Sequence, residues 1–136
     1  MKLDHEYIIE ILNECLEHNE PNIRIGHFNR FREDDENKFY FHILIMQDKG
    51  ILQGSGQNPR EMGINFNSNS DTYTISELPW RLTANGHDFA KNAVKPSIRK
   101  AITSKFKEEG LGAVIDITKK LATKQAEKIL DGVLDE

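Results

Sequence analysis

The chain has 136 residues, of which 38% are hydrophobic and 29% charged, and its formal net charge is -4. This length predicts a single domain, and the composition excludes a disordered or membrane-embedded chain. Apolar runs fall well short of the roughly 18 residues of a membrane-spanning helix, and the N-terminus lacks a signal-peptide pattern, so we expect a cytoplasmic protein without a membrane partner.

The first predicted element is an amphipathic helix over residues 3–18. Apolar side chains recur there at intervals of three and four, with acidic residues between them. Pro21 ends the helix. Cys15, the only cysteine, lies on the apolar side and is interpreted as a buried thiol. Residues 23–28, IRIGHF, then alternate apolar and polar residues, which predicts a short strand or extended segment.

A second helix is expected to begin near EDDEN, where Asp34 or Asp35 can cap it, and to end at Gly50. Phe39, Ile43 and Met46 form one apolar side of this helix. Since it is apolar over much of its circumference, we expect it to lie centrally in the fold.

The next segment predicts a β-structure. ILQ at 51–53 starts as a strand, and INFN at 64–67 and TYTI at 72–75 alternate around a polar turn, as in an antiparallel pair. Residues 80–82 return as a strand. Thr83 then provides the N-cap of a further helix, and Gly86 allows that helix to lie close to the sheet.

Two C-terminal helices are predicted at 97–109 and 113–130, each with an apolar stripe that must be buried. One hypothesis is a homodimer, in which the last helix contacts a second copy through Val114, Ile117, Leu121 and Leu130. The alternative is that both helices fold back and close the core of a monomer.

This order of elements predicts an α+β fold. Residues 1–94 would form a winged helix-turn-helix with a small antiparallel β-wing, and residues 95–136 a C-terminal helical extension of the same domain.

The segments FYFHILIMQDKGIL and LPWRLTANGHDF also resemble a family of small phage and bacterial proteins catalogued as domain of unknown function 2513. The matching positions are Phe41, His42, Ile45, Met46, Gly50 and Ile51, then Pro79, Arg81, Leu82, Thr83, Gly86, His87 and Phe89. The long region between the two segments departs from the family pattern, as does Asp88. The resemblance implies a winged helix in a phage or prophage context, and the family has no established activity.

Winged helices usually place the helix before the wing in the DNA major groove. The corresponding candidates for DNA binding here are Asn37, Lys38, Tyr40, Lys49, Arg60 and Arg81. They predict a DNA-binding protein, and with the phage or prophage context that the resemblance implies, a transcriptional regulator with DNA as its partner. The acidic start of the second helix argues against direct DNA contact. A protein-interaction module, such as an inhibitor or adaptor of a host factor, therefore stays open as the alternative.

Charge is distributed unevenly along the chain. Residues 1–40 carry ten acids and five bases, whereas residues 91–128 carry ten bases and four acids. The histidines and Cys15 lack the paired spacing of zinc sites, and GSG at 54–56 lacks the ending of a phosphate-binding loop. No nucleophile and base stand in a catalytic pattern. We therefore expect no metal, no cofactor and no enzymatic activity.

Overall fold

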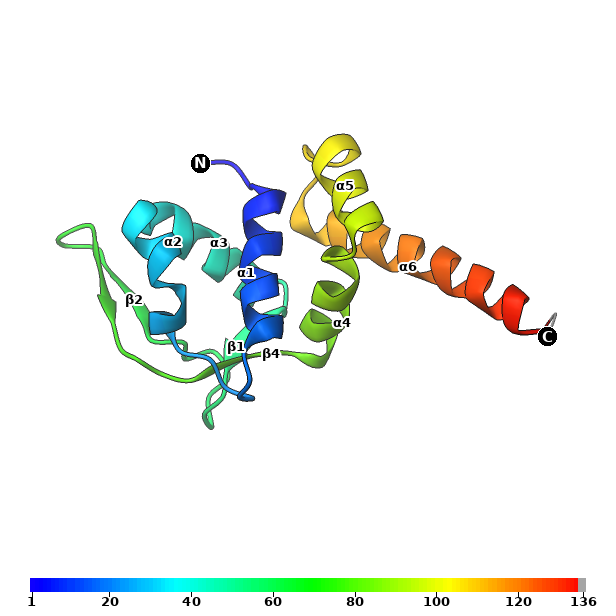
Figure 1. Ribbon diagram of the computed structural model, residues 1–136. Coiled ribbons are helices and arrows are strands. Elements are labelled where there is room, and N and C mark those ends of the chain that lie inside the picture. The colour runs from blue at the N-terminus through cyan, green and yellow to red at the C-terminus, as the bar shows by residue number, and fades with distance from the viewer. Residues whose placement is uncertain (135–136) are drawn as a thin grey trace.

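The structure is a computed structural model and describes residues 1–134, without the side chain of Leu134. These residues form a mixed α+β fold with six α-helices, a short 3-10 helix and two two-stranded antiparallel sheets. Helices and the small sheets gather around α1, while the C-terminal half of α6 projects away from the rest of the molecule (Figure 1).

Helix α1, His5–Glu17, confirms the first predicted helix with slightly shorter ends. The Asp4 side chain caps it by accepting a hydrogen bond from the Tyr7 backbone amide at 3.1 Å. Ile8, Ile11 and Leu12 are buried on its apolar side. This side packs against α4, Ala84–Ala93, and α5, Pro96–Lys105.

The short strand or extended segment predicted at 23–28 is wrong from residue 25 onward. Ile23 alone pairs with another strand, exchanging two backbone hydrogen bonds with Trp80 at 2.7 and 2.8 Å. The chain then forms a 3-10 helix η1, Ile25–Phe28, followed by α2, Asn29–Asp34. Ile25, Phe28 and Phe31 are all buried and follow one another at intervals of three. The segment is helical because these three residues follow a helical spacing, whereas the alternating pattern includes only Ile23 and Ile25.

Helix α3, Glu36–Asp48, confirms the second predicted helix. Of the two proposed caps, Asp35 is the one used, since it accepts a hydrogen bond from the Lys38 backbone amide at 3.1 Å. Gly50 ends the helix with a φ of 70°, in the left-handed region. Phe39, Ile43 and Met46 are completely buried, so α3 has the predicted central position.

Two antiparallel pairs follow. Strand β1, Leu52–Gly54, pairs with β4, Trp80–Leu82, so that Leu52 lies opposite Leu82. Between them, β2, Ile64–Asn67, and β3, Thr72–Ile75, form a separate hairpin at the predicted positions. Because Trp80 also bridges to Ile23, three segments of backbone meet side by side at the base of the hairpin.

The corner between β4 and α4 has the predicted chemistry. The Thr83 hydroxyl accepts a hydrogen bond from the Gly86 amide at 2.9 Å and donates one to the Gly50 carbonyl. Gly86 lies against the backbone of residue 51, and a Cβ atom there would overlap the Ile51 carbonyl. Glycine is therefore required for this close approach.

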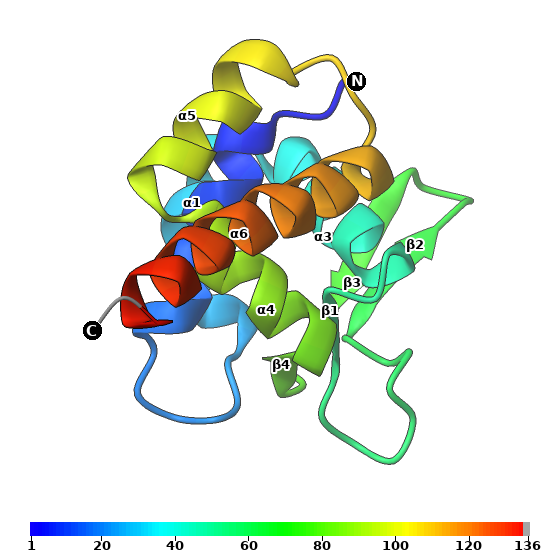
Figure 2. The same ribbon diagram turned by 90° about the vertical axis from the view of Figure 1, so that its right-hand side faces the viewer.

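Helix α6, Leu111–Leu134, is longer at both ends than the predicted 113–130, and α5 ends at Lys105 rather than at 109. Figure 2 shows α6 crossing in front of α4. Leu111, Val114 and Thr118 in its first half are buried. The second half is exposed, including the apolar side chains of Ile129, Leu130 and Val133.

Candidate interaction surfaces

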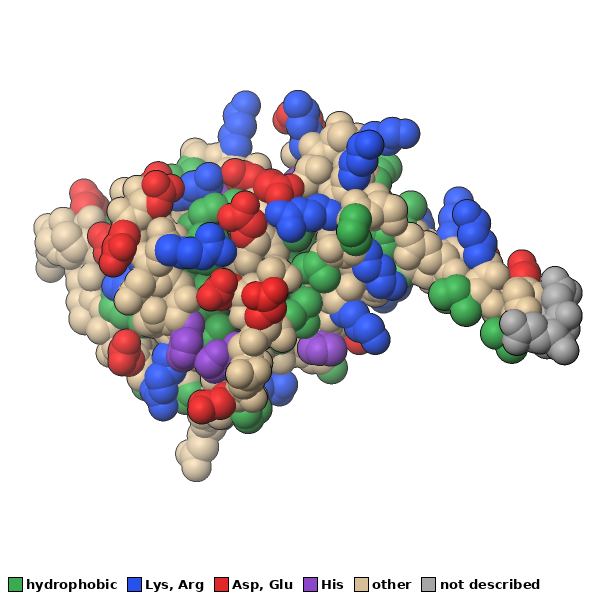
Figure 3. All heavy atoms as spheres, viewed as in Figure 1, with side chains coloured by type: hydrophobic (Ala, Val, Ile, Leu, Met, Phe, Trp, Pro, Cys, Tyr) green, Lys and Arg blue, Asp and Glu red, His purple; other side chains and the backbone are tan. Residues whose placement is uncertain are grey.

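Acidic and basic side chains occupy different parts of the surface. In Figure 3, Asp and Glu gather over α1 and α2, whereas Lys and Arg are prominent over α5 and the adjoining part of α6. The acidic and basic parts of the sequence are therefore also separated on the surface. An anionic partner would be attracted to the α5 and α6 side and repelled from the other.

The outer stripe of α3 consists of Asn37, Phe41, Leu44 and Asp48, which follow one another at intervals of four, three and four residues. The opposite side of the helix is buried in the core. Asn37 and Asp48 are exposed, and Phe41 and Leu44 are partly exposed. The stripe is thus apolar at its centre, polar at both ends, and free of basic residues.

An acidic corner adjoins this stripe where α2 meets α3. Its residues, Glu33, Asp34, Asp35 and Glu36, are all exposed. Asp35 is needed as a helix cap, and Glu36 accepts a hydrogen bond from the Tyr40 hydroxyl at 3.1 Å. Four neighbouring carboxylates at the start of α3 oppose the approach of a phosphate backbone.

Two of the residues predicted to contact DNA have other roles. Tyr40 is only 3% exposed, and its ring packs against Tyr73 of the hairpin at 4.7 Å between centroids, so its assignment as a DNA contact is corrected to a core residue. The Lys38 ammonium pairs with Asp4 at 3.0 Å and lies 4.5 Å from the centroid of the Tyr7 ring. Lys38 thus joins α3 to the start of α1.

The other four predicted DNA contacts belong to different elements, and those that line a hollow line different ones. Asn37 lies on the outer stripe of α3, and Lys49 lines a groove between α4 and α6. Arg81 lines a different hollow, together with His18 and Glu20. Arg60 is exposed in the loop before β2, and its carbonyl accepts a hydrogen bond from Gln47 at 2.7 Å.

The β2–β3 hairpin has one apolar face. The pairing places Ile64 opposite Ile75 and Phe66 opposite Tyr73, with these side chains on the same face. Tyr73 packs on Tyr40 of α3, whereas Phe66 remains 54% exposed. The sequence from 61 to 79 contains three acids and no base. The hairpin therefore presents an aromatic side chain without a basic residue to pair with phosphate.

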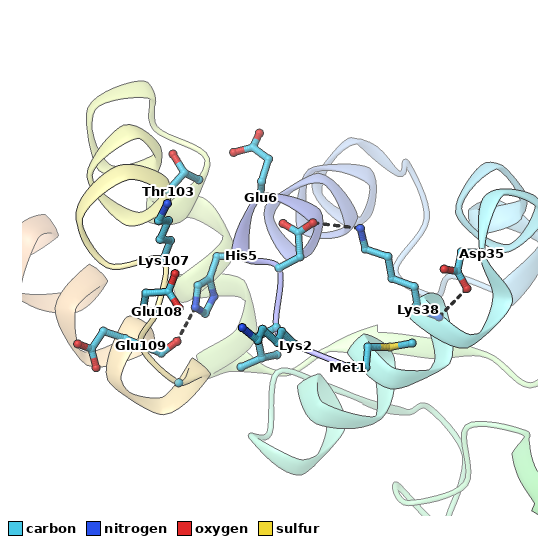
Figure 4. A pocket seen from close by; sticks show the side chains of 13 residues that line it. Met1, Lys2, His5, Glu6, Asp35, Lys38, Thr103, Lys107, Glu108 and Glu109 are labelled. Atoms are coloured by element: carbon cyan, nitrogen blue, oxygen red, sulfur yellow. Dashed lines mark hydrogen bonds and ion pairs between the residues drawn. The ribbon is translucent and has the colours of Figure 1, made fainter.

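A polar crevice of about 680 Å³ surrounds the N-terminus, between α1, the start of α3 and the segment that links α5 to α6. Figure 4 shows His5 directed toward this linking segment, where its Nε2 donates a hydrogen bond to the Glu109 carbonyl at 2.6 Å. On the other side of the crevice, Lys38 pairs with Asp4. These contacts hold the N-terminal residues in place.

His42 is completely buried next to this crevice. Its Nε2 accepts a hydrogen bond from the Asp4 amide at 3.0 Å, and its Nδ1 donates one to the Lys38 carbonyl at 2.7 Å. Both ring nitrogens thus form hydrogen bonds. The arrangement suits only the neutral ring, and burial is the main cause that lowers the pKa of His42.

We expect the free energy of unfolding to fall as the pH drops below about 6.5, because the pKa of His42 is lower in the folded chain, so that the unfolded chain binds the proton more readily. The loss from this one group cannot exceed about 1.4 kcal/mol per pH unit. Urea denaturation at pH 7.5, 6.5 and 5.5 measures it. The slope should be smaller in His42→Gln and unchanged when the exposed His87 is replaced in His87→Gln. Equal slopes in all three proteins would contradict this role of His42.

A groove of about 570 Å³ runs between α4 and the first half of α6. Its apolar floor contains Ile51, Phe89 and Ile115, and its rim carries Lys49, Lys91, Lys95 and Lys119. The sequence did not single out this groove, because it forms where three distant segments meet.

The four residues predicted to form a dimer contact do not share one face. Val114 is 1% exposed and belongs to the core, so its assignment to a dimer contact is corrected. Ile117 and Leu121 are partly exposed and line a hollow beside Phe106 at the end of α5. Leu130 is 56% exposed on the projecting half of α6.

Burial raises the pKa of the Cys15 thiol to about 12, so this cysteine is protonated and unreactive at neutral pH.

In residues 1–134, no three His, Cys, Asp or Glu side chains lie together as a metal site would require. None of the helices in this range has the length and apolar character needed to cross a membrane. No family model, curated protein or solved structure was found to match the chain.

Proposed function

We propose that the protein is a protein-interaction module on a winged-helix scaffold, and that the outer stripe of α3 with the exposed end of the hairpin binds a protein partner. The single observation that carries this proposal is the apolar centre of that stripe, Phe41 and Leu44, bordered by the acidic corner. The complementary partner is a protein with an apolar patch surrounded by basic residues.

The order and pairing of the elements support the winged-helix scaffold. Helix α1, the Ile23 pairing segment, α2, α3, β1, the hairpin and β4 follow one another along the chain. The Ile23 segment pairs with β4, which pairs with β1, as in the small sheet of a winged helix. The resemblance to the phage and bacterial family supports the same assignment and a phage or prophage origin.

Charge and polarity favour a protein over DNA at this surface. A helix in the major groove needs side chains that hydrogen-bond to bases and cations that meet phosphates. The outer stripe offers Asn37 for the first purpose and no residue for the second. Partly exposed aromatic and aliphatic side chains within a polar border are instead typical of protein interfaces, where such residues contribute most of the binding energy.

DNA binding, as a transcriptional regulator, is the second candidate function. The ten bases between residues 91 and 128 favour it. They lie on α4, α5, α6 and the two segments that link these helices, so DNA would contact this side of the molecule rather than α3. The two functions therefore depend on different side chains and can be tested separately.

The test is affinity capture from host lysate, with and without nuclease, using the wild-type protein, Phe41→Glu and Leu44→Glu. We expect one protein partner in a nuclease-resistant, stoichiometric complex, reduced at least about tenfold by either substitution because each places a charge at the centre of the contact. His87→Glu is the matched control, since it adds the same charge at an exposed site on α4. Circular dichroism checks that each variant is folded.

Recovery that depends on nucleic acid, is unchanged by Phe41→Glu and is lost when Lys119, Lys120 and Lys124 are replaced by alanine would favour DNA binding and refute the α3 surface.

A further inference from the structure

The groove between α4 and the first half of α6, where the two helices cross in Figure 2, has a positively charged rim. Lys49, Lys91, Lys95 and Lys119 line it, against a single acid, Asp88. In residues 1–134, none of these lysines lies within 4.0 Å of a carboxylate oxygen. The chain therefore leaves their charge available to an anion.

Lys49 brings its charge to the start of α6. Gly112 lies in the first turn of this helix, and a Cβ atom there would be only 3.3 Å from the Lys49 Nζ. The free amides of a first helical turn carry a partial positive charge, so an ammonium group beside them is unfavourable unless an anion lies nearby. This arrangement favours an anion at this end of the groove.

Thr118 adds a buried hydroxyl to the lining of the groove. The residue is 1% exposed, and in the described part of the chain its Oγ1 has no hydrogen-bond partner. The helical residues Thr103 and Thr123 instead each donate to the carbonyl four residues earlier, at 3.0 and 2.9 Å. A buried hydroxyl without a partner is destabilising. A ligand with an acceptor atom in the groove would remove this effect, because the Thr118 hydroxyl can donate to it.

We propose that this groove binds an organic anion with an apolar body, such as a medium-chain carboxylate. The apolar body packs on Ile51, Phe89 and Ile115, which form the floor. The carboxylate pairs with lysines of the rim and accepts a hydrogen bond from Thr118. Sites for small molecules typically have this composition, with a mostly apolar lining and a few polar groups that fix the orientation of the ligand.

The size of the groove also fits a small molecule. Its volume of about 570 Å³ lies within the range of roughly 300–1,000 Å³ that is usual for such sites. The site is separate from the outer stripe of α3, so ligand binding and the proposed contact with a protein partner depend on different side chains.

The apolar floor distinguishes this ligand from nucleic acid. A DNA backbone would also be attracted to the lysines, but it would leave Ile51, Phe89 and Ile115 without an apolar contact. The two kinds of anion therefore differ in one measurable respect, which is whether binding requires an apolar body.

Isothermal titration calorimetry with decanoate tests the proposal. We expect a dissociation constant on the order of 0.1 mM for the full chain. Decyltrimethylammonium carries the same alkyl chain with the opposite charge and should bind at least about tenfold more weakly. Acetate and inorganic phosphate lack the alkyl chain and should also bind at least about tenfold more weakly.

Two pairs of lysines show which charges attract the ligand. Lys91→Gln with Lys95→Gln removes two charges from the rim and should weaken decanoate binding at least about threefold. Lys120→Gln with Lys124→Gln is the matched control, since it removes two charges at the same spacing from exposed positions of α6 outside the groove. Ile129→Ser is a second control, because Ile129 offers an alkyl chain an exposed apolar contact away from the groove. Both controls should leave the affinity unchanged.

Thr118→Val replaces the buried hydroxyl by a methyl group of similar size. It should weaken decanoate binding about tenfold, because the hydrogen bond to the carboxylate is lost. Stability without ligand should not fall, since the hydroxyl has no partner among residues 1–134. Urea denaturation without decanoate measures this stability and separates a role in binding from a role in folding.

Three results would overturn the proposal. They are no decanoate binding up to about 5 mM, equal affinity for decanoate and decyltrimethylammonium, and equal losses of affinity from the two pairs of lysine substitutions. If Thr118→Val lowers stability but leaves the affinity unchanged, the hydroxyl serves the fold and its role in the site is refuted.

Competition identifies a different occupant. A DNA oligonucleotide or a polyglutamate peptide is expected to bind more weakly than decanoate at this groove. If either displaces decanoate, binds more tightly and loses affinity in Lys91→Gln with Lys95→Gln, the rim serves a macromolecular anion and the proposal is wrong.

Discussion

Gly86→Val is expected to lower the free energy of unfolding by more than about 3 kcal/mol. Any Cβ atom at this position overlaps the carbonyl of Ile51, which is backbone and also accepts a hydrogen bond from the Thr83 amide at 3.0 Å. The chain cannot relieve the overlap without separating α4 from β1. Urea denaturation monitored by circular dichroism measures the loss.

Two substitutions at the same corner serve as controls. Thr83→Ala should cost about 1 kcal/mol, because it removes a helix cap without creating an overlap. Asn85→Ala changes an exposed residue beside Gly86 and should change stability by less than about 0.5 kcal/mol. If Gly86→Val is no more destabilising than Thr83→Ala, helix α4 does not pack on residue 51 as described.

Trp80→Ala is expected to destabilise the protein by about 3–5 kcal/mol. Trp80 is completely buried, its indole stacks on Phe28 at 5.8 Å between centroids, and its Nε1 donates a hydrogen bond to the Met62 carbonyl at 2.6 Å. The substitution therefore leaves a cavity beside Phe28 and a buried carbonyl without its donor. Thermal and chemical denaturation report the change.

Phe66→Ala is the matched control for Trp80→Ala. It also removes an aromatic side chain, but one that is 54% exposed at the end of the hairpin. We expect it to change stability by less than about 1 kcal/mol. A larger loss in Phe66→Ala than in Trp80→Ala would mean that the hairpin, and not the base of the sheet, holds this part of the fold together.

Local sequence patterns predicted most of the elements because they depend on neighbouring residues. Asp35 caps α3, Gly50 ends it, and Thr83 begins α4, each through bonds within a few residues. The exception is the region of η1. There, the alternation of Ile23 and Ile25 predicts a strand, whereas the spacing of Ile25, Phe28 and Phe31 predicts a helix. The chain forms the helix, because this places all three residues of the second pattern in the core.

The candidate surfaces were harder to predict, because exposure depends on contacts between distant residues. Lys38 resembles a free cation in the sequence, yet Asp4 lies 34 positions away and pairs with it. Tyr40 resembles an exposed polar residue until Tyr73 of the hairpin covers it. Phe41 and Leu44 resemble core residues in the sequence, because the sequence does not show which side of an apolar helix remains uncovered.

The groove beside α6 could not be predicted from the sequence for the same reason. Its floor combines Ile51, Phe89 and Ile115, which belong to three separate segments. The periodicity of α6 indicated that apolar side chains needed a partner. It did not distinguish Val114, which the core covers, from Ile129, which projects into solvent.

The position of α1 has a consequence for synthesis on the ribosome. This helix is synthesised before α4 and α5, but its apolar side packs against both of them, and His5 bonds to the carbonyl of Glu109. Translation from residue 17 to residue 105 takes on the order of ten seconds at typical rates. During that interval the apolar side of α1 has neither of these partners. The nascent chain is thus expected to be a chaperone client until its second half has emerged.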